Sequence, residues 1–116
     1  MFKTIDDYLN TLENPLRTWT EQVLTYLKKN YPTYDIVLSY QRPMLKLKPK
    51  LFIMLGGGKQ HFSLYTTDFS YVESFKERKI PRIKFGKSAI LFPLEKPDYI
   101  NLAYRVCDEV IERAKM

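Results

Sequence analysis

The sequence predicts an α+β fold: a two-layer sandwich in which a mainly antiparallel sheet of about six strands carries helices on one face. The clearest sign is the stretch Ser39–Tyr65, where leucines alternate with lysines, Pro49-Lys50 interrupts, and residues 51–55 are apolar throughout. Alternation with a period of two is typical of half-buried strands, and proline and glycine interruptions are typical of turns. We therefore expect three consecutive antiparallel strands here, the middle one most deeply buried.

A second sign is the order of the expected elements, which is helix, four strands, helix, two strands, helix. Runs of strands, rather than strict alternation of strand and helix, favour an antiparallel sheet with its helices gathered on one side. Glycines at 56–58 predict a tight or bulged hairpin, because glycine adopts positive φ without steric cost. The other strands are expected at 35–40, bounded by Gln41-Arg42-Pro43, and at 80–85 and 88–92, with a turn at Gly86-Lys87.

Capping residues and apolar side chains at three- and four-residue spacing predict the helices. Thr4 can cap a helix that starts at Ile5, and Asn14-Pro15 can end it and begin a second, because proline is tolerated at the first helical position. Thr67 or Asp68 can cap a third, and a fourth begins at about Pro97. The expected inward stripes are Leu16, Trp19, Val23, Tyr26 and Leu27 before Tyr31-Pro32; Phe69, Val72 and Phe75 before Lys79; and Ile100, Ala103, Val106, Cys107, Val110 and Ala114.

Length and composition fit one domain spanning residues 1–116. A chain of this size buries roughly two thirds of its unfolded surface, so it needs neither disulfides nor a structural metal to fold. The single cysteine cannot form an internal disulfide, and the first residues lack the apolar run of a secretory signal, so we expect a cytoplasmic protein. No segment approaches the ~18 uninterrupted apolar residues of a membrane span, so no membrane partner is expected.

The sequence resembles the YdhG-like family of small bacterial domains. Three motifs carry the resemblance, in the same order as in the family: S-Y-Q-R-P-M-L-K-L from Ser39, H-F-S-L-Y from His61, and G-K-S-A-I-L-F-P-L-E-K-P from Gly86. The similarity covers roughly Ile5 to Arg113, and the chain differs at Gln41, where the family often has Gly. The resemblance implies an α+β sandwich in the cytoplasm, acting as a frataxin-like intracellular iron chaperone that delivers iron to iron–sulfur or haem assembly proteins.

Three carboxylates on the last predicted helix are the best candidates for iron ligands. Iron binds carboxylate and imidazole groups, and Asp108 and Glu112 lie one turn apart with Glu109 beside them. The alternative is an ordinary solvated face, because Arg105 and Arg113 each lie four residues from Glu109 and predict ion pairs on the helix surface.

A basic, aromatic sheet face is the second candidate site. The chain carries 19 Lys and Arg against 13 Asp and Glu, a net charge of +6, which favours polyanionic partners. Such a face predicts a binding module for nucleic acid or a phosphorylated ligand, through cations for phosphates and rings for stacking. The alternative is a solvated face whose lysines protect edge strands. The candidate ligand-binding residues are Tyr40, Lys46, Lys48, His61, Tyr65, Arg82 and Lys84.

No combination of residues predicts an enzyme. His61 is the only histidine, so a metal site with two histidine ligands cannot be built, and a catalytic dyad would need a nucleophile beside it. Cys107 falls on the inward face of its helix and is expected to be an inert core residue. The glycines at 56–58 followed by Lys59 lack the spacing of a phosphate-binding loop. We expect a non-enzymatic domain, and the oligomeric state is left open.

Overall fold

A single six-stranded sheet organises the molecule, and every neighbouring pair of strands is antiparallel. The structure, a computed structural model, describes residues 2–116. The strands lie side by side in the order β1-β2-β3-β4-β6-β5. Their bounds are β1 (Ile36–Ser39), β2 (Arg42–Lys48), β3 (Leu51–Gly57), β4 (His61–Thr66), β5 (Lys84–Phe85) and β6 (Ala89–Pro93); the helices are α1 (Ile5–Leu9), α2 (Leu16–Asn30), α3 (Phe69–Lys76) and α4 (Ile100–Ala114), the last preceded by the 3₁₀ turn η1 (Pro97–Tyr99).

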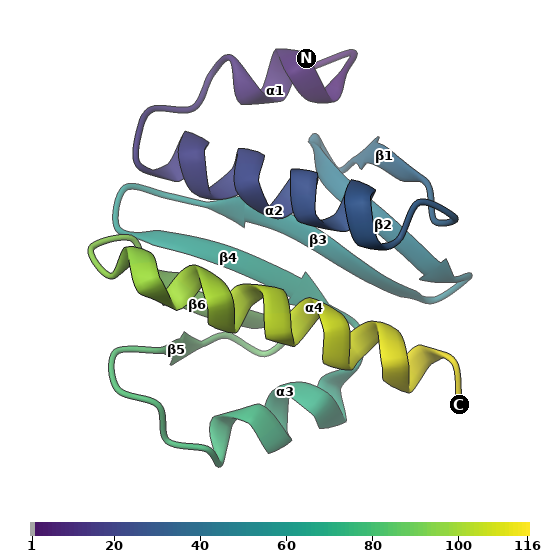
Figure 1. Ribbon diagram of the computed structural model, residues 1–116, viewed down its shortest axis with the longest axis vertical. Coiled ribbons are helices and arrows are strands. Elements are labelled where there is room, and N and C mark those ends of the chain that lie inside the picture. Colours follow the sequence, from purple (N-terminus) through teal and green to yellow (C-terminus); the bar gives the residue numbers. More distant parts are fainter. Residues whose placement is uncertain (1) are drawn as a thin grey trace.

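Helices α2 and α4 lie side by side across one face of the sheet, and α3 lies near β5 at its edge (Figure 1). The core forms between these layers because alternate strand residues point toward the helices. Leu45, Ile53 and Phe62 are at most 1% exposed, and Leu47 is half-buried against the same core. The predicted fold class is therefore confirmed, including the strand and helix order.

An aromatic cluster joins α2 to the middle of the sheet. The Trp19 ring lies 5.6 Å from the Phe62 ring and 6.2 Å from the Phe92 ring, measured between centroids. Such tilted contacts add to the large apolar area that each ring buries. Because Phe62 and Phe92 point inward, their chain neighbours His61 and Pro93 must point to the other face of the sheet.

Two N-terminal helices form, as predicted, but α1 ends at Leu9 rather than at Asn14-Pro15. Thr4 caps α1: its hydroxyl accepts from the Asp7 amide, and the Asp7 carboxylate accepts in return from the Thr4 amide. The predicted start of α2 is one residue too early, because Pro15 is the N-cap and the helix begins at Leu16. Asn14 still acts as a capping side chain, since its Oδ1 accepts from the Thr18 amide and hydroxyl.

The predicted boundary at Gln41-Arg42-Pro43 is wrong. Ser39 pairs directly with Arg42, so Tyr40 and Gln41 alone form the turn and β2 already begins at Arg42. Both turn residues have positive φ, 53° and 62°, which the right-handed twist of a two-residue hairpin favours. Asn and Gly usually occupy such positions, so the Tyr-Gln pair gave no sign of the turn.

Two predictions between residues 67 and 85 also need correction. Helix α3 ends at Lys76 rather than Lys79, and Tyr71 instead of Phe69 joins its buried stripe; Phe69 is 49% exposed. The predicted strand over residues 80–85 shortens to Lys84–Phe85, because Lys79 and Arg82 have positive φ of 54° and 71°. Such residues cannot continue a β-strand, so Arg82 lies in a turn rather than on the sheet.

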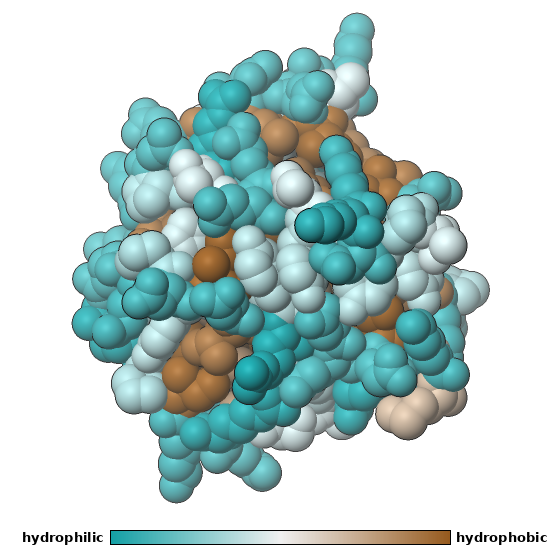
Figure 2. Space-filling model, in the orientation of Figure 1, coloured by the Kyte–Doolittle hydropathy of each residue, from teal (hydrophilic) through white to brown (hydrophobic). Residues whose placement is uncertain are grey.

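The outer surface of the helix layer is mostly polar. On the face shown in Figure 2, hydrophobic areas are separated from one another by hydrophilic side chains. Across residues 2–116, none of the helices has both the length and the apolar character needed to cross a bilayer.

Candidate functional site

The strongest candidate site lies at the end of the sheet where β4 begins and β6 ends. His61 and Pro93 face each other across this pair of strands, and both point away from the aromatic core. Beside them, β5 places Lys84 opposite Leu91 of β6, on the same sheet face as Pro93. The local sequence thus brings an imidazole and an ammonium group to one end of one face.

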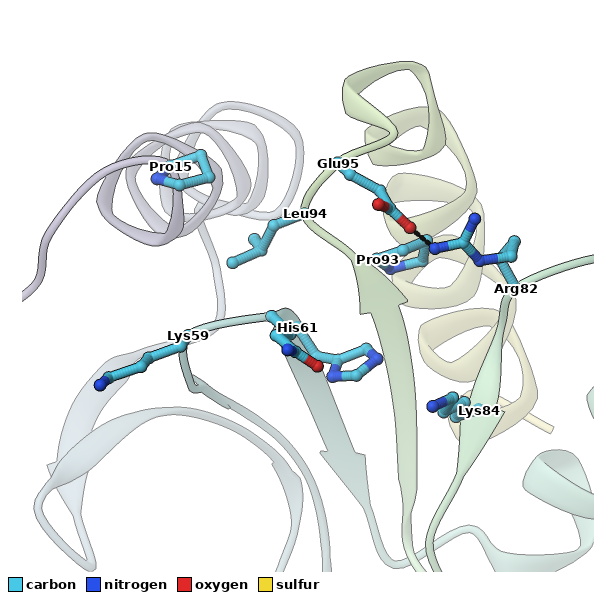
Figure 3. A pocket seen from close by; sticks show the side chains of 9 residues that line it. Pro15, Lys59, His61, Arg82, Lys84, Pro93, Leu94 and Glu95 are labelled. Carbon is cyan, nitrogen blue, oxygen red and sulfur yellow. Dashed lines mark ion pairs between the residues drawn. The ribbon is translucent and has the colours of Figure 1, made fainter.

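A cavity of about 450 Å³ opens at this end of the sheet (Figure 3). We call it the basic pocket. Basic side chains from two segments, 59–61 and 82–84, line it, together with apolar groups from the start of α2 and the end of β6. The lining residues are Lys59, His61, Arg82, Lys84, Glu95, Gln60, Pro15, Pro93 and Leu94.

Glu95 provides the one carboxylate of the basic pocket. It forms an ion pair with the Arg82 guanidinium, and both side chains are more than half exposed, at 57% and 56%. Lys84 has no ion-pair partner among residues 2–116. Lys59 extends away from Arg82 in Figure 3, so it extends the positive charge along the pocket rather than concentrating it.

The surroundings of His61 favour the neutral form of its imidazole. Burial lowers the pKa of its imidazole below the ordinary value of 6.5, and the positive charges of Lys84 and Arg82 lower it further. Nearby positive charges disfavour protonation of the imidazole, whereas an anion bound between these groups would favour protonation. A neutral imidazole can donate one hydrogen bond, and a protonated imidazole can donate two.

The structure brings together only three of the seven predicted ligand-binding residues: His61, Arg82 and Lys84. Lys46 and Lys48 are exposed on β2, and the strands β3, β4 and β6 separate them from β5. At about 4.8 Å per strand spacing, this separation is about 19 Å across the sheet alone. The predicted basic face is therefore two separate basic areas.

Tyr40 and Tyr65 also lie outside the basic pocket. Tyr40 is 80% exposed at the tip of the β1–β2 hairpin. The Arg42 guanidinium lies over the Tyr65 ring, 5.3 Å from its centroid, so a side chain of the protein already covers this ring. The contact passes over Gly56, where a Cβ atom would come within 2.9 Å of the Tyr65 ring and 3.4 Å of Arg42.

The three predicted metal ligands point to different partners. Both carboxylate oxygens of Asp108 accept from the Tyr26 hydroxyl, at 2.9 and 2.7 Å, and Oδ1 also accepts from the Tyr31 hydroxyl at 2.5 Å. Glu112 is exposed and lies 4.0 Å from Lys115. Within residues 2–116 no three His, Cys, Asp or Glu side chains form a group that could hold a metal ion. These donors do not fit an iron site.

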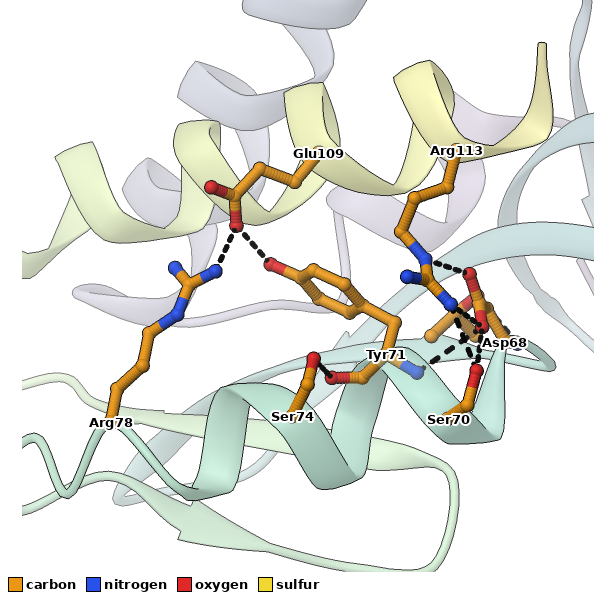
Figure 4. Close-up of polar contacts among 8 residues, drawn as sticks. Asp68, Ser70, Tyr71, Ser74, Arg78, Glu109 and Arg113 are labelled. Carbon is orange, nitrogen blue, oxygen red and sulfur yellow. Dashed lines mark hydrogen bonds and ion pairs between the residues drawn. The ribbon is translucent and has the colours of Figure 1, made fainter. Parts of the chain in front are cut away.

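Glu109 belongs instead to a polar network that joins α3 to α4 (Figure 4). Its Oε1 accepts from the Tyr71 hydroxyl at 2.7 Å and pairs with Arg78 at 2.9 Å. Arg113 forms a two-pronged contact with Asp68, at 2.7 and 3.0 Å. The prediction that Glu109 pairs with arginines on its own helix is wrong, because its partner and that of Arg113 both lie outside α4.

Cys107 is fully buried, as predicted, and burial raises the pKa of its thiol well above the ordinary value. A thiol with a raised pKa carries little thiolate, the reactive form.

Sequence reasoning missed Lys59, Glu95 and the apolar wall of the pocket. These residues come from loops and strand ends, whose positions depend on the sheet topology. One sequence signal was available: six of the twelve residues from 76 to 87 are basic, namely Lys76, Arg78, Lys79, Arg82, Lys84 and Lys87. This segment places two of its basic residues in the pocket.

Comparison with known proteins finds the same fold in a solved structure. Neither a family model nor a curated protein matches the sequence. Among solved structures, the same α+β sandwich occurs in the crystal structure of YdhG, a protein of the DUF1801 family from Bacillus subtilis. The match has a TM-score of 0.72 and covers 96% of this chain and 91% of that chain, at 23% sequence identity. The predicted YdhG-like character is thus confirmed for the fold.

Proposed function

We propose that the protein is a non-enzymatic domain that binds a small phosphorylated ligand in the basic pocket. The observation that carries this proposal is the meeting of His61, Arg82 and Lys84 around one cavity. Arginine presents a planar fork of donors that matches a phosphate group, and lysine adds a mobile point charge. His61 completes the set with a ring N–H.

The cavity favours a small ligand over a nucleic acid. Its volume of about 450 Å³ falls within the range of small-molecule sites. A nucleic acid needs several cations along a continuous path to hold successive phosphates. The other predicted cations, Lys46 and Lys48, lie across three intervening strands and do not extend the pocket.

The composition of the pocket supports binding rather than catalysis. None of its lining residues is Ser, Thr or Cys, so His61 has no neighbouring nucleophile there to activate. The proposal places the chain in the YdhG-like family and in the cytoplasm, where the sequence features predict it. The proposal does not name a protein partner.

Iron delivery to iron–sulfur or haem assembly proteins, which the family resemblance implies, is the less favoured function. Asp108 accepts from two tyrosine hydroxyls and Glu109 pairs with Arg78, so binding iron would require breaking these contacts. We expect anaerobic calorimetric titration with ferrous iron to give no heat beyond the buffer. Micromolar binding that is lost in Glu109→Gln would instead restore the iron function.

A titration with phosphate tests the proposed function. We expect inorganic phosphate to shift the backbone amide resonances of His61 and its neighbours in heteronuclear NMR spectra. Lys84→Gln should weaken binding by roughly fivefold, because it removes a cation from the pocket. The matched control is Lys46→Gln, which removes the same charge from the distant end of β2 and should change the affinity by less than about twofold. Equal losses in both variants would mean that only net charge matters.

A further inference from the structure

A second hollow adjoins the basic pocket. It has a volume of about 620 Å³ and shares Pro15, Lys59 and Leu94 with the pocket. Its other walls come from the loop between α1 and α2 and from the β3–β4 hairpin. We call it the leucine hollow, after Leu12, Leu16 and Leu94, which line it. A ligand could therefore reach from one cavity into the other past Leu94.

The two cavities differ in chemistry. The basic pocket carries an imidazole and two cations beyond the shared Lys59. The leucine hollow combines the side chains of three leucines and Pro15 with the uncharged polar Thr11 and Asn14. Its one ionised group besides Lys59 is the exposed Glu13 carboxylate, which would repel an anion. A ligand that fits both cavities has a single anionic end and an uncharged, apolar body.

Gly58 lines the leucine hollow and leaves open space where a side chain would begin. At the neighbouring Gly57, a Cβ atom would lie 2.5 Å from the His61 carbonyl oxygen and 2.7 Å from Leu16, and φ is 149°. Gly57 is thus required by packing and by backbone conformation. At Gly58, which lines the hollow, a Cβ atom would meet no other atom within 4 Å. A larger side chain at this position would project into open space rather than into the protein.

We propose that the site takes a small organic phosphate monoester, with its phosphate in the basic pocket and its apolar body in the leucine hollow. This inference rests on the proposed function, because the phosphate end uses the same cations. The apolar body would lie against Leu12 and Leu94, across the open space at Gly58. Burial of that body would add affinity in proportion to the apolar area removed from water.

Three probes separate the two ends of the ligand: inorganic phosphate, hexyl phosphate and hexanol. We expect hexyl phosphate to bind about tenfold more tightly than inorganic phosphate in calorimetry, and hexanol to bind far more weakly than hexyl phosphate. Hexyl phosphate binding no better than inorganic phosphate would overturn the inference while leaving the proposed function intact. Hexanol binding as tightly as hexyl phosphate would also overturn it. If neither phosphate binds, both proposals fail.

Gly58→Val tests the location of the apolar body. The valine should occupy the part of the hollow next to Gly58 and reduce the advantage of hexyl phosphate, while inorganic phosphate binds within about twofold of the original affinity. Unchanged binding of hexyl phosphate to a folded Gly58→Val protein would place its body elsewhere and overturn the inference. Leu12→Ser supplies a second variant if the valine impairs folding, with the same two expected outcomes.

A vesicle experiment distinguishes the source of the phosphate monoester. Phosphatidic acid carries the same headgroup chemistry, so vesicles of phosphatidylcholine with phosphatidic acid are compared with pure phosphatidylcholine. Cosedimentation only with phosphatidic acid, reduced by Lys84→Gln, would support a lipid source. Binding of hexyl phosphate without cosedimentation would support a free metabolite.

Discussion

The α3–α4 interface and the basic pocket contain similar charged side chains but satisfy them differently. Between α3 and α4, Arg113 donates two hydrogen bonds to Asp68, and Glu109 accepts from both Tyr71 and Arg78. In the basic pocket, Arg82 and Glu95 form an exposed pair, and Lys84 lacks an ion-pair partner within residues 2–116.

The difference separates a structural role from a binding role. Charges that already have well-aligned partners stabilise the contact between two elements and offer little to a ligand. Charges around a cavity without such partners can bind an anion at little structural cost. Substitutions in the α3–α4 interface should therefore affect stability alone, and substitutions of the cations in the basic pocket should affect binding alone.

The largest expected effect comes from Gly57→Ala, which breaks the hairpin that supports the basic pocket. The new Cβ would meet the His61 carbonyl oxygen in a backbone conformation that alanine rarely adopts. We expect a loss of about 3 kcal/mol in the free energy of unfolding, or about 15 °C in Tm. Gly58→Ala is the matched control and should change stability by less than about 0.5 kcal/mol. Equal effects of the two substitutions in urea unfolding would show that the hairpin is not packed as described.

The next effect is expected from Asp68→Ala at the α3–α4 interface. This change removes the cap of α3, where Asp68 accepts from the Tyr71 amide, and both hydrogen bonds from Arg113. We expect a loss of about 2 kcal/mol in urea unfolding with unchanged phosphate affinity. Glu95→Ala is the control, because loss of its exposed pair with Arg82 should cost less than about 0.5 kcal/mol. A similar loss in both variants would remove the distinction between the two regions.

Acid should erase part of the Asp68 effect. Hydrogen bonds from Arg113 hold the pKa of this carboxyl below its ordinary value of 3.8. A lowered folded-state pKa contributes stability above the unfolded value, and that stability is lost as pH falls through the folded value. The stability difference between the wild type and Asp68→Ala should therefore be largest above about pH 5 and shrink below the ordinary value of 3.8. A difference that stays constant to pH 2 would contradict the role of the charge.

A smaller loss is expected from Tyr71→Phe. The ring remains in place, and only the 2.7 Å hydrogen bond from its hydroxyl to Glu109 disappears. Because Arg78 still pairs with Glu109, we expect a loss of about 1 kcal/mol. Thermal unfolding measures this loss. Tyr40→Phe, at a position that is 80% exposed, should leave the stability unchanged in the same experiment.

The smallest effect sharpens the role of His61 in the basic pocket. Burial and the charges of Lys84 and Arg82 lower the pKa of its imidazole, so His61 is neutral at pH 7.5, while Glu95 offsets part of the Arg82 charge. A bound anion favours the protonated ring, so binding takes up a proton and strengthens as pH falls. Sulfate, whose charge is constant in this range, should bind about threefold more tightly at pH 5.5 than at pH 7.5. The same gain in His61→Gln would rule out this histidine as its source.

The sequence predicted the layers well because they depend on local periodicity. Alternation in β2 and β4 and the apolar stripes of α2 and α4 decide which side chains face the core, and Thr4 and Asp68 cap their helices as predicted. The predicted element boundaries were wrong where a residue adopts a backbone conformation that is unusual for its type. Tyr40, Gln41, Lys79 and Arg82 all have positive φ, and none is a residue type that predicts it.

The candidate site was less predictable because it depends on contacts between distant segments. Lys46 and Lys84 follow the same alternation in the sequence, yet their strands lie at different positions in the sheet order. The partners of Asp108 are tyrosines about eighty residues earlier in the chain, separated by 82 and 77 positions. No helix-surface rule identifies such partners, so Asp108 resembled a free ligand in the sequence alone.

Because Cys107 is buried, chemical modification of its thiol depends on unfolding of the chain. The folded molecule shields its only cysteine sulfur completely, so oxidants and alkylating reagents meet it only after the helix layer opens. Two opened chains can then cross-link through a disulfide, and such dimers cannot refold as monomers. Heating in air should consequently be irreversible, whereas the same heating with a reductant present should remain reversible.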